Sequence, residues 1–392
     1  LQAVSDNVAT VMPGARLIAL STYPEQDRRE HPDTDVEILS LKPHELLFPT
    51  LPLALLIAAA RKLGLEGRAL AWTAPLRALM DAAAVADLAG ISFADGRGIP
   101  TLAYNILMTG IPLLVGAPVV KCAQAMGTFK SPLNRMAARV VLSNVTEIVA
   151  RGPTTLANLE DLGIRDAAQG ADLAFLMETP ESADLEAEEI CAGLANKAFV
   201  AVSPSSVLRR LCERDDIDYV DLMSRTCDQL VRDLDLDVLV LAHSARSGMP
   251  EGRMNDLPVC RDIAARVWNK DRVTVVDRSI APATLRAIIG RSEVLLTSRF
   301  HAMISALATC TPMVVLGWSH KYEEVLDSFG LGEWVLGHQG VSASVLADRT
   351  ASAIRRKQEI SDQIAGRLVN ARLEAGVSLD ALARVASHTA GF

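Results

Sequence analysis

The sequence predicts an α/β protein made of two Rossmann-like domains that face each other across a cleft. Short apolar runs, typical of buried parallel strands, alternate with helical patterns in two successive series. The two series also share a plan: an acidic residue precedes a strand, and a loop, a short apolar helix, an x-Pro step and another strand follow. Ligands bind at the carboxyl ends of strands in open α/β sheets, so we expect the functional residues in those loops.

The first series spans residues 1–177 and predicts the N-terminal domain. It opens with the end of a helix, a turn at Pro13-Gly14 and a strand over 16–20. No strand precedes this helix, so we expect the domain to lack its first strand and ligand loop. Further strands are expected at DVEILSL (35–41), ADLAGIS (86–92), PLLVGAP (112–118), EIVAR (147–151) and DLAFLM (172–177).

The second series spans residues 198–340 and predicts the C-terminal domain. Its expected strands lie in FVAVSPSS (199–206), DVLVLAHS (237–244), VTVVD (273–277), EVLLTS (293–298) and PMVVLGWS (312–319). The acidic segment 178–197 separates the two series and is predicted to be the linker. Residues 341–392 carry helical patterns rich in Ala, Arg and Glu, which predict C-terminal helices packed alongside.

The composition limits the possible functions. Half of the 392 residues are hydrophobic, and the net charge is −8, so we expect a packed protein and no nucleic-acid groove. The six cysteines lack metal-ligand spacing, which indicates free thiols in a reducing cytosol and no metal site. The most apolar stretch, 46–64, contains two prolines and a threonine and falls short of the roughly 20 residues of a membrane span. We expect a buried helix there, with peripheral membrane contact as the alternative.

The stretch LLTSRFHAMISAL (295–307) combines a strand end, a helix start and two basic side chains. Ser298 is expected to cap the helix, whose free N–H groups attract an anion. Arg299 adds a fork of donors suited to phosphate or carboxylate. His301 can exchange a proton near neutral pH. The alternative is a surface arginine with a histidine packed under a loop, because such clusters are also structural.

Other loops of the second series supply further candidates for anion binding. His320 and Lys321 follow the next strand and should reach the same ligand. Ser205 and His243 end their strands in the same way, although a lone histidine at a strand end is more often a hydrogen-bonded structural group. The alternative for Lys321 is a solvated lysine, which the helix dipole disfavours at that position.

The first series offers candidates in three loops. FADGRG (93–98) carries Asp95, a possible base or orienting group, and Gly96, whose freedom a plain turn would equally explain. AQAMGTF (123–129) offers Gln124 and Gly127. Arg151 ends EIVAR and is expected to face the cleft as a second anion anchor.

The segment from 292 to 331 resembles the polysaccharide pyruvyl transferase family. The family's hallmark is a strand ending in Ser-Arg-x-His-Ala, a short helix, x-Pro and a strand, then a lysine before a helix. The matching positions here are Ser298, Arg299, His301, Ala302, Pro312 and Lys321. Weaker likeness runs from the first residues to about 335. Two loops depart from the family pattern, because 92–96 read Ser-Phe-Ala-Asp-Gly instead of a glycine triplet and Ala125 and Thr128 replace Ser and Pro.

The resemblance implies a fold similar to GT-B glycosyltransferases. It also implies transfer of pyruvate from phosphoenolpyruvate to a sugar hydroxyl pair, as a ketal on a cell-surface polysaccharide or glycolipid precursor. It places Arg299, His301 and Lys321 in the donor site. With the loop candidates above, we expect His301 and Asp95 to be catalytic. The expected donor-binding residues are Arg299, Lys321, Arg151, Ser298, His320, Ser205 and His243, and the expected acceptor-binding residues are Gln124, Gly127 and Gly96.

Phosphoenolpyruvate is then the donor substrate, and the acceptor is a sugar, lipid-linked or free. We expect no cofactor beyond a loosely bound divalent cation, a cytoplasmic location and at most peripheral contact with the inner face of the membrane. One rival function is a GT-B glycosyltransferase that uses a nucleotide sugar, with Glu323 or Glu324 holding the ribose. Another is a protein that binds anionic saccharides without catalysis.

Overall fold

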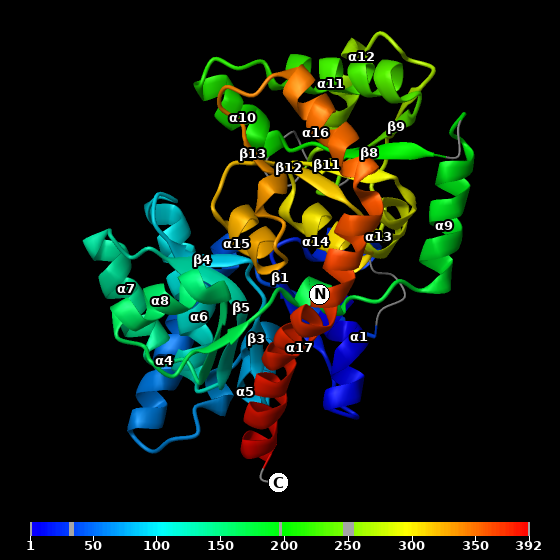
Figure 1. Ribbon diagram of the computed structural model, residues 1–392. Helices are drawn as coiled ribbons and strands as arrows, with labels where there is room; N and C mark the ends of the chain where they lie inside the picture. Colours follow the sequence, from blue (N-terminus) through cyan, green and yellow to red (C-terminus); the bar gives the residue numbers. More distant parts are fainter. Residues whose placement is uncertain (1, 31–34, 196–197, 246–254, 391–392) are drawn as a thin grey trace. The chain divides into compact units, whose positions relative to one another are not determined.

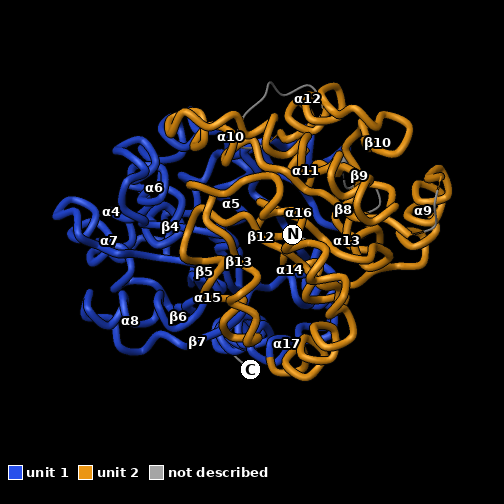
Figure 2. The backbone as a smooth tube through the Cα atoms, turned by 45° about the horizontal axis from the view of Figure 1, so that its top comes forward, with its two compact units in different colours: residues 1–177, 371–392 blue, residues 178–370 orange. Residues whose placement is uncertain are grey.

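The chain divides into two compact α/β units. The computed structural model describes residues 2–30, 35–195, 198–245 and 255–390. Unit 1 comprises 1–177 together with 371–392, and unit 2 comprises 178–370 (Figure 2). Every strand pairing in both units is parallel, which confirms the predicted fold class.

Unit 2 is built on a six-stranded sheet in the order β10-β9-β8-β11-β12-β13. Its strands are β8 (Phe199–Ser203), β9 (Asp237–Leu241), β10 (Val273–Val276), β11 (Val294–Thr297), β12 (Met313–Gly317) and β13 (Val335–Gly337). The residues of β8, β9, β11 and β12 are all buried, because helices cover both faces of this parallel sheet. The chain runs outward from β8 in one direction and then returns to β11 and runs outward in the other. The sheet therefore reverses its strand order between β8 and β11.

Helices lie over both faces of the unit 2 sheet. Helices α11 and α16 lie over one face and α13 and α14 over the other (Figure 1). The helices of this unit are α9 (Glu181–Ala192), α10 (Ser206–Arg214), α11 (Tyr219–Leu234), α12 (Leu257–Arg266), α13 (Pro282–Arg291), α14 (Phe300–Ala308), α15 (Lys321–Ser328), the 3₁₀ turn η4 (Gly332–Trp334), α16 (Ala343–Arg355) and the first part of α17 (Lys357–Ala390).

Unit 1 contains two parallel sheets. A small sheet joins β1 (Ile18–Ser21) and β2 (Glu37–Ser40). The larger has the order β3-β5-β6-β7, with β4 also paired to β5. Its strands are β3 (Val85–Asp87), β4 (Ile91–Ala94), β5 (Val119–Gly127), β6 (Glu147–Arg151) and β7 (Ala168–Gly170).

The helices of unit 1 come from both ends of the chain. They are α1 (Gln2–Val11), α2 (Pro24–Glu30), α3 (Pro43–Glu45), the π-helical turn η1 (Leu46–Thr50), α4 (Leu51–Lys62), the 3₁₀ turn η2 (Arg68–Leu70), α5 (Ala74–Asp81), α6 (Ile99–Val115), α7 (Pro132–Leu142), α8 (Gly152–Leu162) and the 3₁₀ turn η3 (Leu173–Leu176). The end of α17 completes the set. Its Leu379 and Leu382 pack on Val120 and Val149 of the larger sheet, and the Ser378 hydroxyl accepts a 3.1 Å hydrogen bond from the Ala123 amide.

Three strand predictions in the first series were wrong in detail. PLLVGAP closes α6, whose C-terminus is capped by Gly116 at φ +86°, and the strand β5 follows it. DLAFLM forms the turn η3, whose N-cap residue is Asp172. ADLAGIS covers the end of β3 and the start of β4. Short apolar runs do not separate a buried strand from the end of a buried helix, because both are apolar on all sides.

Residues 178–195 of the segment expected as a linker are a structured part of unit 2, and 196–197 lie outside the described residues. The segment contains α9, which packs on α13. Glu186 accepts hydrogen bonds of 2.7 Å from both Arg278 and Thr284, and Asp184 accepts one of 2.7 Å from Arg291. The acidic composition therefore reflects pairing with arginines. The boundary between the units falls at 177/178, and the predicted C-terminal helices divide between the two units instead of forming a separate layer.

The most apolar stretch is longer and more exposed than its sequence suggests. Residues Pro43–Lys62 form a 20-residue helical stretch that is long and apolar enough to cross a membrane, and 22% of its most apolar window is buried. Pro52 lies in the first turn of α4, where proline is tolerated, so it does not shorten that helix. The kink lies at Phe48, whose φ of −145° is not helical. The expectation of a buried helix was therefore wrong.

Candidate functional site

The best candidate site lies at the carboxyl edge of the unit 2 sheet, where β8 and β11 are neighbours. Ser203 ends β8 and Thr297 ends β11, and these two residues are in register. Ligands of open α/β sheets bind where the strand order reverses, so this edge is the candidate site. The segment after β11 is the one that carries Arg299 and His301.

Arg299 begins this site. It is the N-cap residue of α14, and its guanidinium forms an ion pair with Asp256. The Asp256 side chain has no exposed surface, whereas that of Arg299 is 17% exposed. Asp256 also accepts hydrogen bonds from the amides of Ser206, at 2.9 Å, and Ser244, at 3.2 Å. One buried carboxyl group therefore ties the loops after β8 and β9 to the arginine that follows β11.

Ser298 does not cap α14 as predicted. Its side chain is buried and its hydroxyl lies 3.1 Å from the Tyr219 hydroxyl. The Thr297 hydroxyl instead accepts a 2.9 Å hydrogen bond from the Arg299 amide. Ser298 is therefore part of the support beneath the site. Burial raises the pKa of the Tyr219 phenol, so this tyrosine stays protonated and can serve as a donor.

Lys321 begins α15 and lies against three aromatic rings. Its ammonium is 4.8 Å from the centre of the Trp318 ring, 5.1 Å from that of Phe300 and 5.2 Å from that of Tyr322. Phe300 is the first residue of α14, so these contacts hold the ammonium beside the N-terminus of that helix. The Tyr322 hydroxyl donates a 3.0 Å hydrogen bond to the Ser298 carbonyl, which links α15 to the same loop.

Two histidines face each other near the start of α14. The rings of His301 and His243 are stacked, with their centroids 6.5 Å apart. His301 is exposed to solvent. Burial, together with the charges of His301, Arg299 and Arg286, lowers the pKa of His243 to about 3. His243 is thus neutral near pH 7, while the exposed His301 is the member of the pair that can reach a substrate.

Buried polar atoms without a hydrogen-bond partner among the described residues gather at this edge. They include the Ser203 hydroxyl at the end of β8 and His243 Nε2 after β9. Buried polar groups in proteins are nearly always paired, so each unpaired one calls for an explanation. The ends of β8 and β9 therefore add neutral hydrogen-bonding groups to the charged Arg299 at this edge.

The remaining predicted residues of unit 2 have different roles. Ser205 caps α10, because its hydroxyl accepts from the amides of Val207 and Leu208 at 3.2 and 3.4 Å. It is buried, so it shapes the loop after β8. His320 is the exposed N-cap residue of α15, directly before Lys321.

Asp95 in unit 1 stabilises a turn. It accepts hydrogen bonds from the Thr128 hydroxyl, the amides of Lys130 and Ser131, and the Asn134 side chain at distances from 2.7 to 3.4 Å. Burial alone would raise the pKa of Asp95, but these hydrogen bonds outweigh it and lower the pKa. A carboxylate with a lowered pKa is a weaker base. This arrangement argues against the predicted catalytic role.

The predicted acceptor residues of unit 1 are also explained by packing. Gln124 is fully buried, and its amide donates to Asp87 and accepts from Ser92. Gly127 has φ +102°, and a Cβ there would lie 2.5 Å from the Asn158 side chain, so close packing requires glycine. Gly96 has φ +76° with open space around it, which fits a turn. The buried Gln124 in particular is not available to a sugar.

Arg151 belongs to unit 1 and is buried. Its guanidinium forms a 2.8 Å ion pair with Asp172, the N-cap residue of η3. The sequence predicted that this arginine would join Arg299 and Lys321 around one anion. The structure instead gives it a buried partner within its own unit, since β6 and β7 bring Arg151 and Gly170 into register and Asp172 follows closely.

Several important residues were missed from the sequence. Asp256 precedes a Leu-Pro step at the start of α12, a common helix beginning that does not by itself indicate an arginine partner. Lys121 is fully buried and pairs with Asp87 at 2.6 Å, within a strand that reads as apolar. Trp318 follows β12 beside Lys321, and an aromatic next to a predicted ligand-binding lysine was the available signal.

No group of three or more His, Cys, Asp or Glu within the described ranges is arranged to hold a metal ion. Apart from Asp256, which is paired with Arg299, the polar groups of the carboxyl edge are cationic or neutral hydrogen-bonding groups. Arg299, Lys321 and the N-terminus of α14 favour an anion, and neutral His243 favours a hydrogen-bonding group.

Comparison with known proteins assigns both a family and a fold. The family model described as polysaccharide pyruvyl transferase matches residues 13–320. The amylovoran biosynthesis protein AmsJ of Erwinia amylovora is 22% identical over 290 residues, which cover 72% of this chain and 68% of that protein. The range matched by the family model includes β8, β9, β10, β11 and β12 of unit 2, with Arg299 and His301, and ends one residue before Lys321.

Solved structures show the fold. UDP-GlcNAc 2-epimerase from Neisseria meningitidis, solved bound to UDP-GlcNAc, superposes with a TM-score of 0.62 at 10% identity, covering 98% of this chain and 97% of that one. UDP-N-acetylglucosamine 2-epimerase from Rickettsia bellii gives 0.59 at 11% identity, covering 100% and 94%. The chain therefore has a GT-B-like fold, as its sequence predicted.

Proposed function

The chain belongs to the polysaccharide pyruvyl transferase family, and on that premise we propose that it transfers the pyruvyl group of phosphoenolpyruvate to a pair of sugar hydroxyls. The product is a pyruvate ketal on a precursor of a cell-surface polysaccharide or glycolipid. The family assignment supports the transferase class. The name of the Erwinia relative supports a role in polysaccharide biosynthesis.

The proposed reaction is balanced without a redox cofactor. The methylene carbon of phosphoenolpyruvate takes up a proton and becomes the methyl group. The central carbon then carries oxocarbenium character, and one sugar hydroxyl attacks it. Phosphate leaves as the second hydroxyl attacks the same carbon. The two hydroxyls release two protons, one of which balances the proton on the methyl carbon while the other leaves with phosphate.

Arg299 and Lys321 are the proposed anchors of the two anionic groups of the donor. The pairing of Arg299 with buried Asp256 fixes one edge of its guanidinium, which presents five N–H donors in all. The side chain is 17% exposed, so this pairing presents the guanidinium to phosphate or carboxylate in a defined direction. Lys321 is held beside the same helix start by the surrounding rings. The N-terminus of α14 adds its partial positive charge.

His301 is the proposed proton-transfer group. It follows Arg299 by two residues and is exposed, so it can approach the methylene carbon or an attacking hydroxyl. Stacking on His243 restricts its ring orientation. Because the pKa of His243 is lowered to about 3, the neutral His243 donates or accepts hydrogen bonds without competing for the transferred proton.

The observation that carries this proposal is the ion pair between Arg299 and Asp256 at the reversal of strand order. The fully buried Asp256 carboxyl group accepts hydrogen bonds from two loop amides and pairs with one arginine. Burying a carboxylate has a large desolvation cost, and a need to orient the arginine explains why the cost is met here. Orientation matters for a planar donor that recognises a planar anion.

The proposal is tested by incubating the protein with phosphoenolpyruvate and candidate saccharides. We expect phosphate release that depends on the saccharide, together with a new methyl proton signal from the ketal in the NMR spectrum of the product. Binding of phosphoenolpyruvate should also be detectable by calorimetry, with UDP-N-acetylglucosamine as the comparison ligand. Tight binding of the nucleotide sugar without binding of phosphoenolpyruvate would favour a glycosyltransferase instead.

A further inference from the structure

Helix α4 of unit 1 presents an apolar face to solvent. Leu55, Leu56 and Leu63 are 52%, 53% and 77% exposed, and their spacing places them on one side of the helix. The preceding turn adds Leu47 at 53% and Phe48 at 77%. Surface helices normally carry charged or polar residues on the outer side. An apolar outer face of this extent indicates an interaction surface.

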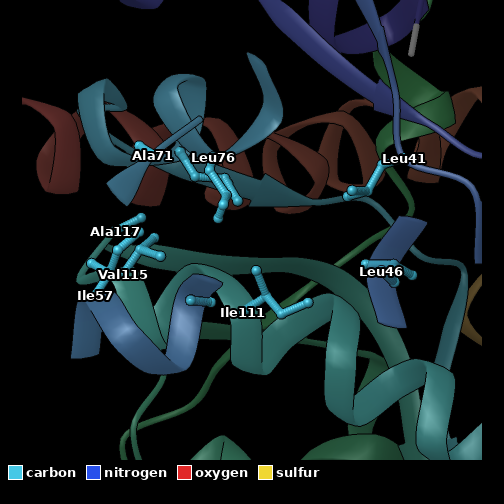
Figure 3. Packing of buried hydrophobic residues seen from close by; sticks show 10 residues of the cluster. Leu41, Leu46, Ile57, Ala71, Leu76, Ile111, Val115 and Ala117 are labelled. Carbon is cyan, nitrogen blue, oxygen red and sulfur yellow. The ribbon is translucent and has the colours of Figure 1, made fainter. Parts of the chain in front are cut away.

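The opposite face of α4 is anchored in unit 1. Ala54 and Ile57 have no exposed surface and pack with Leu76 of α5 and Ile111 of α6 (Figure 3). This packing has a consequence for the 20-residue apolar stretch. If the helix crossed a bilayer, it would have to leave that core, whereas a helix that lies along the surface keeps it.

Basic residues follow the apolar face in the chain. Arg61 and Lys62 occupy the last turn of α4, and Arg68, which pairs with Asp81, and Arg77 come after them. Residues 42–81 contain five Lys or Arg and three Asp or Glu, a net charge of 5 − 3 = +2, in a chain whose net charge is −8. The segment is therefore positive within an acidic protein, which complements an anionic membrane surface.

An aromatic and a cavity lie at the end of this segment. Trp72 is 73% exposed, and its Nε1 donates a 2.8 Å hydrogen bond to the Ala69 carbonyl. Beside it is a cavity of about 330 Å³, whose lining includes Arg68, Arg77 and Asp81; Asp81 pairs with Arg68 at 2.6 Å, so the cavity carries one net positive charge. Tryptophan prefers the boundary between lipid and water, and arginine binds phosphate groups, so both suit a headgroup region.

We propose that the outer face of α4, together with the basic loop through Trp72, docks this protein on a membrane that contains anionic lipids. The leucines enter the boundary between headgroups and acyl chains, while Lys62 and the arginines meet lipid phosphates. The helix lies parallel to the membrane plane. This inference does not depend on the proposed reaction, because it concerns a surface of unit 1 and binding to lipid alone.

The test is co-sedimentation of the whole protein with vesicles. Vesicles of phosphatidylcholine mixed with phosphatidylglycerol should bind the wild-type protein, and vesicles of phosphatidylcholine alone should bind it more weakly. The double variant Leu55→Glu/Leu56→Glu removes two inserted side chains and should lower the partition coefficient by roughly a hundredfold. Lys62→Ala should lower it about fivefold and should reduce its dependence on salt.

A matched control separates docking from general loss of hydrophobicity. Val369 and Leu373 of α17 are 64% and 70% exposed and lie four residues apart, so Val369→Glu/Leu373→Glu makes the same chemical change elsewhere. The control should bind vesicles as the wild type does. Urea unfolding of both double variants checks that each remains folded.

Two results would overturn the proposal. One is equal vesicle binding by wild type and the Leu55/Leu56 variant. The other is a wild-type dimer that does not bind vesicles and becomes monomeric in that variant, as measured by light scattering. That second result would show that a second copy of the chain covers the α4 face.

Discussion

The pairing of Arg299 with Asp256 makes a prediction that separates folding from ligand binding. Arg299→Ala leaves the Asp256 carboxyl group without its cationic partner in a position with no exposed surface. Breaking a buried ion pair from one side typically costs about 3–5 kcal/mol. We therefore expect the free energy of unfolding of Arg299→Ala to fall by roughly that amount, in addition to any loss of donor binding.

A second variant, Arg299→Ala/Asp256→Asn, removes the arginine and the carboxylate together. The asparagine side-chain carbonyl can still accept from the Ser206 amide, but the uncompensated carboxyl group is gone. We expect this double variant to recover about 2 kcal/mol of the lost stability relative to Arg299→Ala. Phosphoenolpyruvate binding should not recover, since the charge-assisted contact from the arginine, worth about 1.5–3 kcal/mol, is missing in both variants.

The assays are urea unfolding followed by tryptophan fluorescence, and calorimetric titration with phosphoenolpyruvate. Relative to Arg299→Ala, the double variant should recover part of the unfolding stability and none of the affinity for phosphoenolpyruvate. If Arg299→Ala is as stable as the wild type, the pair does not act as a buried ion pair. If the double variant binds phosphoenolpyruvate as tightly as the wild type, Arg299 does not anchor the donor.

Three further predictions concern single residues. His301→Gln should lower turnover by about 10²–10⁴-fold while phosphoenolpyruvate affinity stays within a few-fold, and near-normal turnover would leave only a positioning role. The folded protein lowers the pKa of His243 from 6.5 to about 3, so the contribution of this residue to stability is complete above pH 6.5 and declines as the pH falls towards about 3. In urea unfolding at several pH values, His243→Gln should make the free energy of unfolding fall less steeply with decreasing pH, by at most about 1.4 kcal/mol per pH unit. If the variant and the wild type show the same pH dependence, the lowered pKa of His243 is contradicted. Lys121→Met leaves the Asp87 carboxylate without its partner and should lower the free energy of unfolding by about 3–5 kcal/mol. Lys121→Met/Asp87→Asn should restore most of that stability. If the double variant is no more stable than the single one, the broken ion pair does not explain the loss.

The second half of the chain was the more predictable from its sequence. Each of its five expected strands is present, because β8, β9 and β11 are buried at every residue, consist mostly of apolar residues and are flanked by polar loops. The edge strand β13 was missed, since it has three residues and only partly buried side chains. Chain order and the rule for parallel sheets were enough to place Arg299, His301 and Lys321 at one edge of one unit.

The first half was less predictable because polar side chains are satisfied inside it. Gln124 looked available for a ligand, but it lies within β5 and shares hydrogen bonds with Asp87 and Ser92. Arg151 looked like an anion anchor, but Asp172 from a later loop neutralises it. Partners that are distant in sequence determine both outcomes, and residue type and spacing do not identify such partners.

The shared helix α17 also has a consequence for synthesis. Unit 1 is assembled from the first 177 residues and the last 22, since residues 371–392 belong to it. The ribosome therefore releases all of unit 2 before the residues that cover Val120, Cys122 and Val149 are available. Until then this face of the larger sheet in unit 1 lacks its helix and exposes apolar surface of the kind that chaperones bind. Unit 2, whose residues are contiguous, can fold while the chain is still being made, so the unit that begins first is completed last.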